Sequence, residues 1–170
     1  MSELNAPSTP WRAEVIQDFA RSELFQRTFQ EGMDLVEETA GYLDGGGRQA
    51  SKLLSRNAAL AYAAESMRLT TRLMQVASWL LVQRAVREGD MAAEAALDQS
   101  YRLSAEVAHH AGGSSEILPQ PLTVLLDRSE RLFERVRHLD ARMYLENAPE
   151  ADAPHPVLAQ MARLQDAFGG

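Results

Sequence analysis

The stretch ESMRLTTRLMQVASWLLVQRAV, residues 65–86, decides the fold, because it contains neither proline nor glycine and is rich in strong helix formers. It belongs to a longer segment, about 48–87, for which the spacing of apolar residues predicts one continuous helix. Two apolar rows run along this helix. The first repeats every seven residues and consists of Leu53, Leu60, Met67, Met74 and Leu81. The second lies on roughly the opposite side and consists of Tyr62, Leu69, Leu73, Val76 and Leu80.

An apolar surface on two sides of one helix predicts two packing partners. At about 1.5 Å per residue the helix would be about 60 Å long, which is more than one small domain requires. We therefore expect one row to pack on the chain's own bundle and the other on a second copy of the chain. The sequence does not decide which row faces which partner. The candidates that we single out for the dimer interface are Leu69, Leu73 and Leu80.

The rest of the chain also favours helices. All seven prolines lie outside residues 11–118, and no segment shows the alternation of β-branched residues that is typical of strands. Further helices are predicted over 22–43, over 90–110 with weaker periodicity, and from Pro121 onward. The fold class is therefore all-α, an antiparallel bundle of three long helices plus a shorter helix and a flexible C-terminal tail.

This pattern also predicts the domain organisation. We expect a flexible N-terminal arm over 1–20, a helical bundle over 21–146, and an acidic, proline-rich linker followed by an amphipathic tail over 147–170. The tail is predicted to contact a partner protein rather than the core. Its apolar anchors are Leu158, Met161, Leu164 and Phe168.

Composition excludes several functional classes. A net charge of −7 and a pI of about 5.1 argue against binding to nucleic acid or to anionic membranes. The absence of cysteine excludes disulfides, thiolate zinc sites and cysteine nucleophiles. The N-terminus lacks a signal-peptide pattern, and no apolar stretch is long enough to span a bilayer. These features predict a cytoplasmic protein without a membrane anchor.

The glycines of YLDGGGRQASK, residues 42–52, raise the question of a phosphate-binding loop. Such a loop needs the order GxxxxGK[ST] between a strand and a helix, whereas Lys52 here follows Ala50 and Ser51 and no strand precedes. We interpret 45–47 as a hinge whose glycines adopt left-handed conformations. The charged residues around this hinge could still form a recognition surface at an exposed end of the bundle, and the candidates are Asp44, Arg48 and Lys52.

Catalytic and metal-binding patterns are weak. Glu106 and His109 form one Glu-x-x-His unit, but a di-iron bundle needs two such units and two further glutamates. No serine is flanked by glycines as in a nucleophile elbow. The arginines after Pro121 are balanced one for one by acidic residues, which argues against a DNA-binding face. We therefore predict no catalytic residue, no metal ligand and no cofactor.

The stretch from Phe25 to Val86, and above all residues 65–86, closely resembles the RcdA proteins of alphaproteobacteria, the regulators of CtrA degradation. ILPQPLTVLLDRSERLFERVRHLD, residues 117–140, resembles the last bundle helix of that family. The resemblance implies a homodimeric helical adaptor without catalytic activity. Such adaptors are recruited to the ClpXP protease after it is primed by the response regulator CpdR. They deliver cell-cycle regulators, CtrA among them through the cyclic-di-GMP-binding adaptor PopA.

The resemblance also implies recruitment to the cell pole together with these partners. Two alternatives from other classes stay open at the level of sequence. A small-ligand-binding helical protein would need a buried polar site among its helices. A DNA-associated regulator would need an uncompensated basic face.

Overall fold

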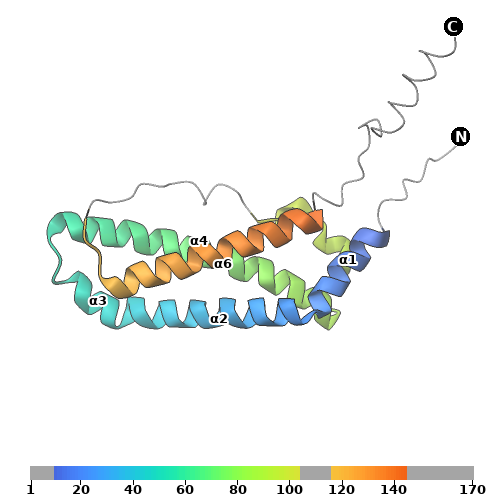
Figure 1. Cartoon of the computed structure of the whole chain (residues 1–170), viewed down its shortest axis with the longest axis horizontal. Helices are drawn as coiled ribbons and strands as arrows, with labels where there is room; N and C mark the ends of the chain where they lie inside the picture. The colour runs from blue at the N-terminus through green and yellow to red at the C-terminus, as the bar shows by residue number, and fades with distance from the viewer. Residues whose placement is uncertain (1–9, 104–115, 145–170) are drawn as a thin grey trace, which may run out of the picture.

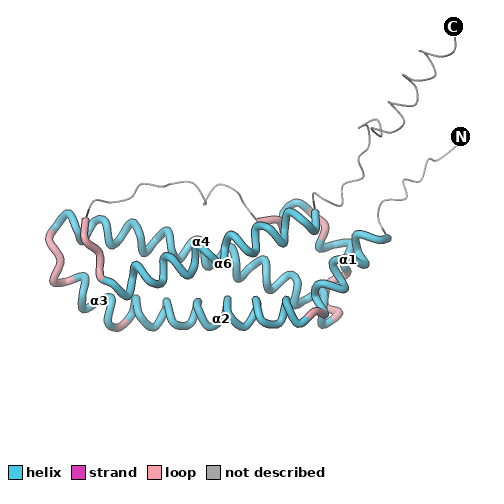
Figure 2. Tube along the Cα trace, in the orientation of Figure 1, coloured by secondary structure: helices cyan, strands magenta, loops and turns pink. Residues whose placement is uncertain are grey.

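The structure, a computed structural model, describes residues 10–103 and 116–144 (Figures 1 and 2). Every regular element in these ranges is a helix, which confirms the all-α prediction. The helices are α1 (Pro10–Arg21), α2 (Glu23–Asp44), α3 (Gly46–Ser51), α4 (Arg56–Glu88), α5 (Ala93–Ala96), the 3-10 helix η1 (Gln99–Tyr101) and α6 (Gln120–Tyr144).

Helices α2, α4 and α6 form the bundle, and α1 crosses one of its ends (Figure 1). Helix α2 runs against both of the others, whereas α4 and α6 run in the same direction. All three helices meet at Gly32 of α2, where an added Cβ would lie 2.6 Å from Leu80 Cδ1 of α4 and 3.8 Å from Leu132 Cδ2 of α6. The glycine therefore sets the distance at which the core side chains interdigitate.

Helix α1 corrects the prediction of a flexible arm over 1–20, which is wrong for residues 10–20. Ala13, Ile16 and Ala20 lie at helical spacing and are buried against the bundle. Ser22 then separates α1 from α2, because its hydroxyl donates to Phe19 O (2.6 Å) and accepts from Phe25 N (3.1 Å). The row escapes sequence analysis because two of its three members are alanine, which is a weak signal of burial.

The predicted helix over 48–87 is divided in two, and this is a second correction. Helix α3 ends at Ser51, and α4 begins only at Arg56. Ser55 is the N-cap of α4, and its Oγ accepts from Ala58 N at 3.2 Å. A serine that caps a helix has extended backbone geometry and so interrupts the helix that precedes it. Leu53 consequently lies in the turn rather than on α4.

The helix predicted over 90–110 is wrong in its described part, where α5 and η1 are single turns. Helix α4 ends at Gly89, whose φ of 82° is the left-handed conformation that favours glycine. The segment after η1 is fixed to α6 by the buried carboxylate of Asp140, which accepts from Arg102 Nη2 at 3.1 Å. This segment is therefore held in place by a long-range polar contact and not by forming a long helix.

Candidate interaction surface

The structure decides which apolar row of α4 faces the core. Leu69, Leu73 and Leu80 are at most 4% exposed and pack inside the chain's own bundle. Their assignment to a dimer interface was therefore wrong. The heptad row has the opposite environment, with exposed fractions of 64% for Leu60 and 73% for Met67. The row continues with Met74 and Leu81, which are also exposed.

The surface around the heptad row carries no charge. From Asn57 to Leu81, every exposed residue of α4 is neutral, and we call this surface the neutral face. Its members are Asn57, Leu60, Ala63, Ala64, Met67, Thr70, Thr71, Met74, Ser78 and Leu81. From Leu60 to Leu81 it extends over about 32 Å. Four large apolar side chains separated by small residues form a surface typical of helix–helix contact.

Three charged residues of α4 between Asn57 and Leu81 are buried or half-buried and have partners within the chain. Arg72 is buried, and its Nη1 donates to Ser129 Oγ on α6 at 2.9 Å. Glu65 and Arg68 form a half-buried ion pair on the same helix, with 2.5 Å between Oε1 and Nη1. Because these groups find partners within the bundle, α4 can bury its polar sector and leave an apolar row in water.

The glycine hinge has a different geometry from the one that the sequence suggests. Gly45 has φ −111° and ψ −106°, and among the glycines of the described segments only Gly89 has a positive φ. The prediction of left-handed glycines at 45–47 is therefore wrong. Gly47 is required for a steric reason, because an added Cβ would lie 2.5 Å from Tyr62 Oη and 2.7 Å from Tyr42 Cε1. The hinge is thus packed tightly on two tyrosines.

Asp44, Arg48 and Lys52, the predicted recognition residues, are all exposed around this hinge. Lys52 follows the end of the short helix α3, and the element that leads directly into the glycines is the helix α2 and not a strand. Beneath the hinge, the hydroxyls of Tyr42 and Tyr62 are buried and have no hydrogen-bond partner within the described residues. The pKa of Tyr42 is raised above its usual 10.0, mainly because the hydroxyl is buried and secondly because of electrostatic repulsion from the neighbouring Tyr62.

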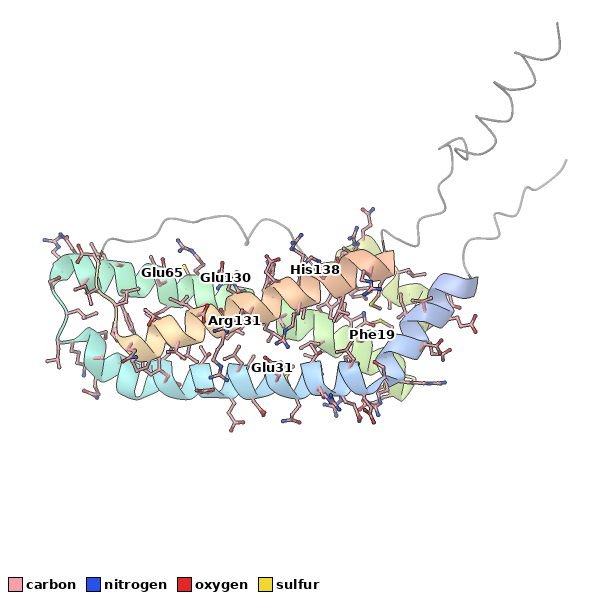
Figure 3. The ribbon with its side chains drawn as sticks, in the orientation of Figure 1. Phe19, Glu31, Glu65, Glu130, Arg131 and His138 are labelled. Atoms are coloured by element: carbon pink, nitrogen blue, oxygen red, sulfur yellow. The ribbon has the colours of Figure 1, made fainter. Side chains whose placement is uncertain are left out.

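The outer surface of α6 is a network of ion pairs. Arg128 pairs with Glu38 of α2 (Nη1–Oε2 2.6 Å), and Arg135 pairs with Glu31 of α2 (Nη2–Oε1 2.5 Å). Within α6, Arg131 pairs with Asp127, and Arg137 pairs with Glu134. Glu31 projects from α2 and Arg131 from α6 (Figure 3). The arginines and acidic residues that balance in the sequence therefore also lie next to each other in the structure. Because these arginines are already paired with carboxylates, they are poorly suited to bind DNA phosphates.

Several predicted features lie outside the described residues, namely Glu106, His109 and the tail anchors Leu158, Met161, Leu164 and Phe168. Over residues 10–103 and 116–144, no three His, Cys, Asp or Glu side chains come together as metal ligands. Over the same residues, no helix is both long and apolar enough to cross a bilayer.

Sequence reasoning missed three polar residues of the bundle core, Arg72, Gln83 and Asp140. Asp140 had a detectable signal, because it stands four residues after the core residue Val136 and so falls on the buried stripe of α6. It also missed an apolar groove between α2 and α4, which Leu43, Asp44 and Met74 help to line. No local pattern marks that groove, since its walls come from two helices.

Comparison with known proteins places the chain in a group of similar sequences. Residues 16–168 match a family described as a protein of unknown function, DUF1465. A solved structure described as RcdA from Caulobacter crescentus CB15 is 69% identical in sequence, with a TM-score of 0.65. The similarity covers 76% of this chain and 98% of that one. No curated protein sequence matches the chain.

Proposed function

Because the chain belongs to the RcdA family, we propose that it is a non-enzymatic adaptor of regulated proteolysis in the cytoplasm. In this role it is recruited to the ClpXP protease once the response regulator CpdR has primed it. It delivers cell-cycle regulators for degradation, and for CtrA it acts together with the cyclic-di-GMP-binding adaptor PopA. The observation that carries the proposal is the 69% identity to RcdA of Caulobacter crescentus over 98% of that chain.

The surface of the described residues supports an adaptor role. An adaptor needs faces that contact other proteins, and the neutral face of α4 offers a long apolar row whose exposed neighbours on the helix are uncharged. Monomeric proteins rarely leave such a contiguous row in water, because covering it removes apolar surface from the solvent.

We propose that the neutral face forms the homodimer. Seven-residue spacing makes the row complementary to itself in an antiparallel pair. If two copies of α4 cross between Thr70 and Thr71, Leu60 of one copy lies opposite Leu81 of the other. Met67 then lies opposite Met74, and the small threonines at the crossing allow the helices to approach closely. No like charges would meet across this interface.

We also propose that the tail anchors Leu158, Met161, Leu164 and Phe168 make part of the partner contact, with Asp44, Arg48 and Lys52 as a second contact surface. A tethered peptide of low affinity raises the effective concentration of the other contact to about the millimolar range. Delivery would then require both contacts at once.

A reconstituted degradation assay tests this function. Purified ClpXP, CpdR and a substrate regulator are incubated with the full-length chain and with a chain that ends at Leu145. We expect the full-length chain to accelerate substrate loss and the truncated chain to accelerate it much less, while both melt at nearly the same temperature. If the full-length chain leaves the degradation rate unchanged, the adaptor function is wrong. A large fall in melting temperature on truncation would instead make the tail a packed part of the bundle.

A further inference from the structure

An apolar groove of about 280 Å³ lies between α2 and α4, on the α2 side of the neutral face. Val36 and Leu43 form its α2 wall, and Leu73 and Met74 form its α4 wall. Met74 belongs to both the groove and the neutral face. An apolar depression of this size accommodates one large side chain of a binding partner.

The one charged residue of the groove's lining is acidic. Asp44 is the only charged residue of its lining, and Glu37 stands seven residues earlier on the same side of α2. On the opposite side of α2, Glu31 and Glu38 are neutralised by arginines of α6. Asp44 and Glu37 have no ion-pair partner within residues 10–103 and 116–144. The rim therefore favours a ligand that carries positive charge.

The wall of the groove also contains a buried polar group, the hydroxyl of Thr39. Thr39 is one of the groove's lining residues and is 4% exposed, and its Oγ1 has no hydrogen-bond partner in the described structure. Thr28, Thr70 and Thr71 behave differently, because each donates to the carbonyl four residues earlier in its helix. Buried hydroxyls without partners are uncommon in folded proteins unless a ligand or water completes them.

We propose that this groove binds a peptide segment of a partner protein in which a large apolar side chain stands next to a lysine or arginine. The inference deepens the adaptor role proposed above and rests on it for its biological meaning. The apolar side chain would fill the space between Leu43 and Met74, and the base would pair with Asp44 or Glu37.

Other occupants match the rim less well. A second copy that docks through its neutral face brings no base, since that face is uncharged. The chain's own residues 145–170 contain four acidic residues (Glu146, Glu150, Asp152 and Asp166) against the single arginine Arg163, so the rim repels them. An anionic lipid surface is repelled for the same reason.

Two matched peptides test the proposal with the full-length protein, Ac-Ala-Arg-Leu-Leu-Arg-Ala-NH₂ and Ac-Ala-Glu-Leu-Leu-Glu-Ala-NH₂. Binding is followed at low salt by the methionine methyl signals in NMR, with Met74 as the reporter in the groove. We expect the arginine peptide to shift the Met74 signal and to bind about tenfold more tightly than the glutamate peptide. Asp44→Lys should weaken the arginine peptide by about tenfold or more. Asp18→Lys makes the same charge change on the exposed side of α1 and should leave binding unchanged.

Filling the groove provides a second variant. Ala40→Phe adds volume at a lining position that is exposed, so the helix content by circular dichroism should persist while both peptides lose binding. Equal binding of the two peptides would overturn the proposal, and so would normal binding by Asp44→Lys. A Met74 signal that responds to neither peptide would overturn it as well.

The degradation assay separates this inference from the proposed function. If the wild-type chain delivers substrate and Ala40→Phe delivers it equally well, the groove has no role and the adaptor function stands. If the wild-type chain delivers nothing while the arginine peptide still binds at Met74, the groove is a peptide site and the adaptor function is wrong.

Discussion

Trp79 donates its indole N–H to the buried carboxylate of Asp140 across the α4–α6 interface, with 3.0 Å between Nε1 and Oδ1. The same carboxylate accepts from Arg102 Nη2 at 3.1 Å. One side chain of α6 therefore holds both the C-terminal part of α4 and the segment after η1. A charge this deeply buried is stable only while its donors stay in place.

Replacing Asp140 should be costly. We expect Asp140→Ala to lower the free energy of unfolding by about 3 kcal/mol, because the indole N–H and the guanidinium of Arg102 lose their partner. Urea denaturation followed by circular dichroism measures the effect. The control is Asp127→Ala, which removes an exposed carboxylate paired with Arg131 and should cost about 0.5 kcal/mol or less. Equal losses for the two variants would contradict a structural role for Asp140.

The hinge glycines should differ sharply in their tolerance of alanine. An added Cβ at Gly47 would meet Tyr62 Oη at 2.5 Å and the backbone oxygen of Tyr42 at 2.8 Å, whereas at Gly46 nothing lies within 4 Å. We expect Gly47→Ala to destabilise the protein by about 1–3 kcal/mol. Gly46→Ala should be neutral or should stabilise it by up to about 1 kcal/mol, since alanine favours the helical state. Thermal melts of the two variants decide the matter, and a reversed order would refute this account.

Stability at high pH should depend on Tyr42. Its pKa is higher in the folded state than the usual 10.0, so the stability linked to this group is complete below pH 10. It is lost as the pH rises through the folded-state value, because the unfolded chain ionises its tyrosine first. We expect Tyr42→Phe to flatten the fall of the melting temperature above about pH 10. Tyr101→Phe, at an exposed tyrosine, should keep the wild-type slope.

Two nearby residues of α4 can separate the proposed dimerisation from folding. Met67 is 73% exposed on the neutral face, and Leu69 is fully buried in the bundle. We expect Met67→Glu to give a folded monomer, since the charge enters only the interface between copies. Leu69→Glu should unfold the chain, because an unpaired carboxylate would lie in the core. Sedimentation velocity and circular dichroism report the two outcomes. A wild-type protein that stays monomeric at all concentrations would contradict the dimer.

Gln83 offers a stabilising substitution. The residue is fully buried, and neither Oε1 nor Nε2 of its amide has a hydrogen-bond partner in the described structure. Gln83→Met keeps a similar shape and removes the unpaired amide, so we expect a gain of about 1–2 kcal/mol in unfolding free energy. A loss of stability in thermal or urea unfolding would show that the amide has a structural role.

Local patterns were sufficient to predict the long helices. The helix predicted over 22–43 corresponds to Glu23–Asp44, and the helix predicted from Pro121 corresponds to Gln120–Tyr144. Both show one apolar stripe, and such a stripe determines the inward face without knowledge of any partner. The family could also be predicted from the sequence, because the resemblance rests on the continuous stretch of residues 65–86.

The orientation of α4 could not be predicted from periodicity. Its apolar residues lie on two sides, and its buried side also contains Arg72, whose partner Ser129 is 57 residues away in sequence. The groove beside Thr39 and the contact between Trp79 and Asp140 are non-local for the same reason. Such features arise from pairs of helices, and a single helix pattern holds no information about its neighbour.

The uncharged surface of α4 also sets how much free protein a cell can hold. A side that lacks charged residues has no electrostatic barrier against adhering to other apolar surfaces, and the net charge of −7 lies elsewhere on the molecule. Copies made in excess of their partners would therefore be the first to associate. If α4 is the contact surface proposed above, the same residues tie the useful abundance of the protein to the supply of its partners.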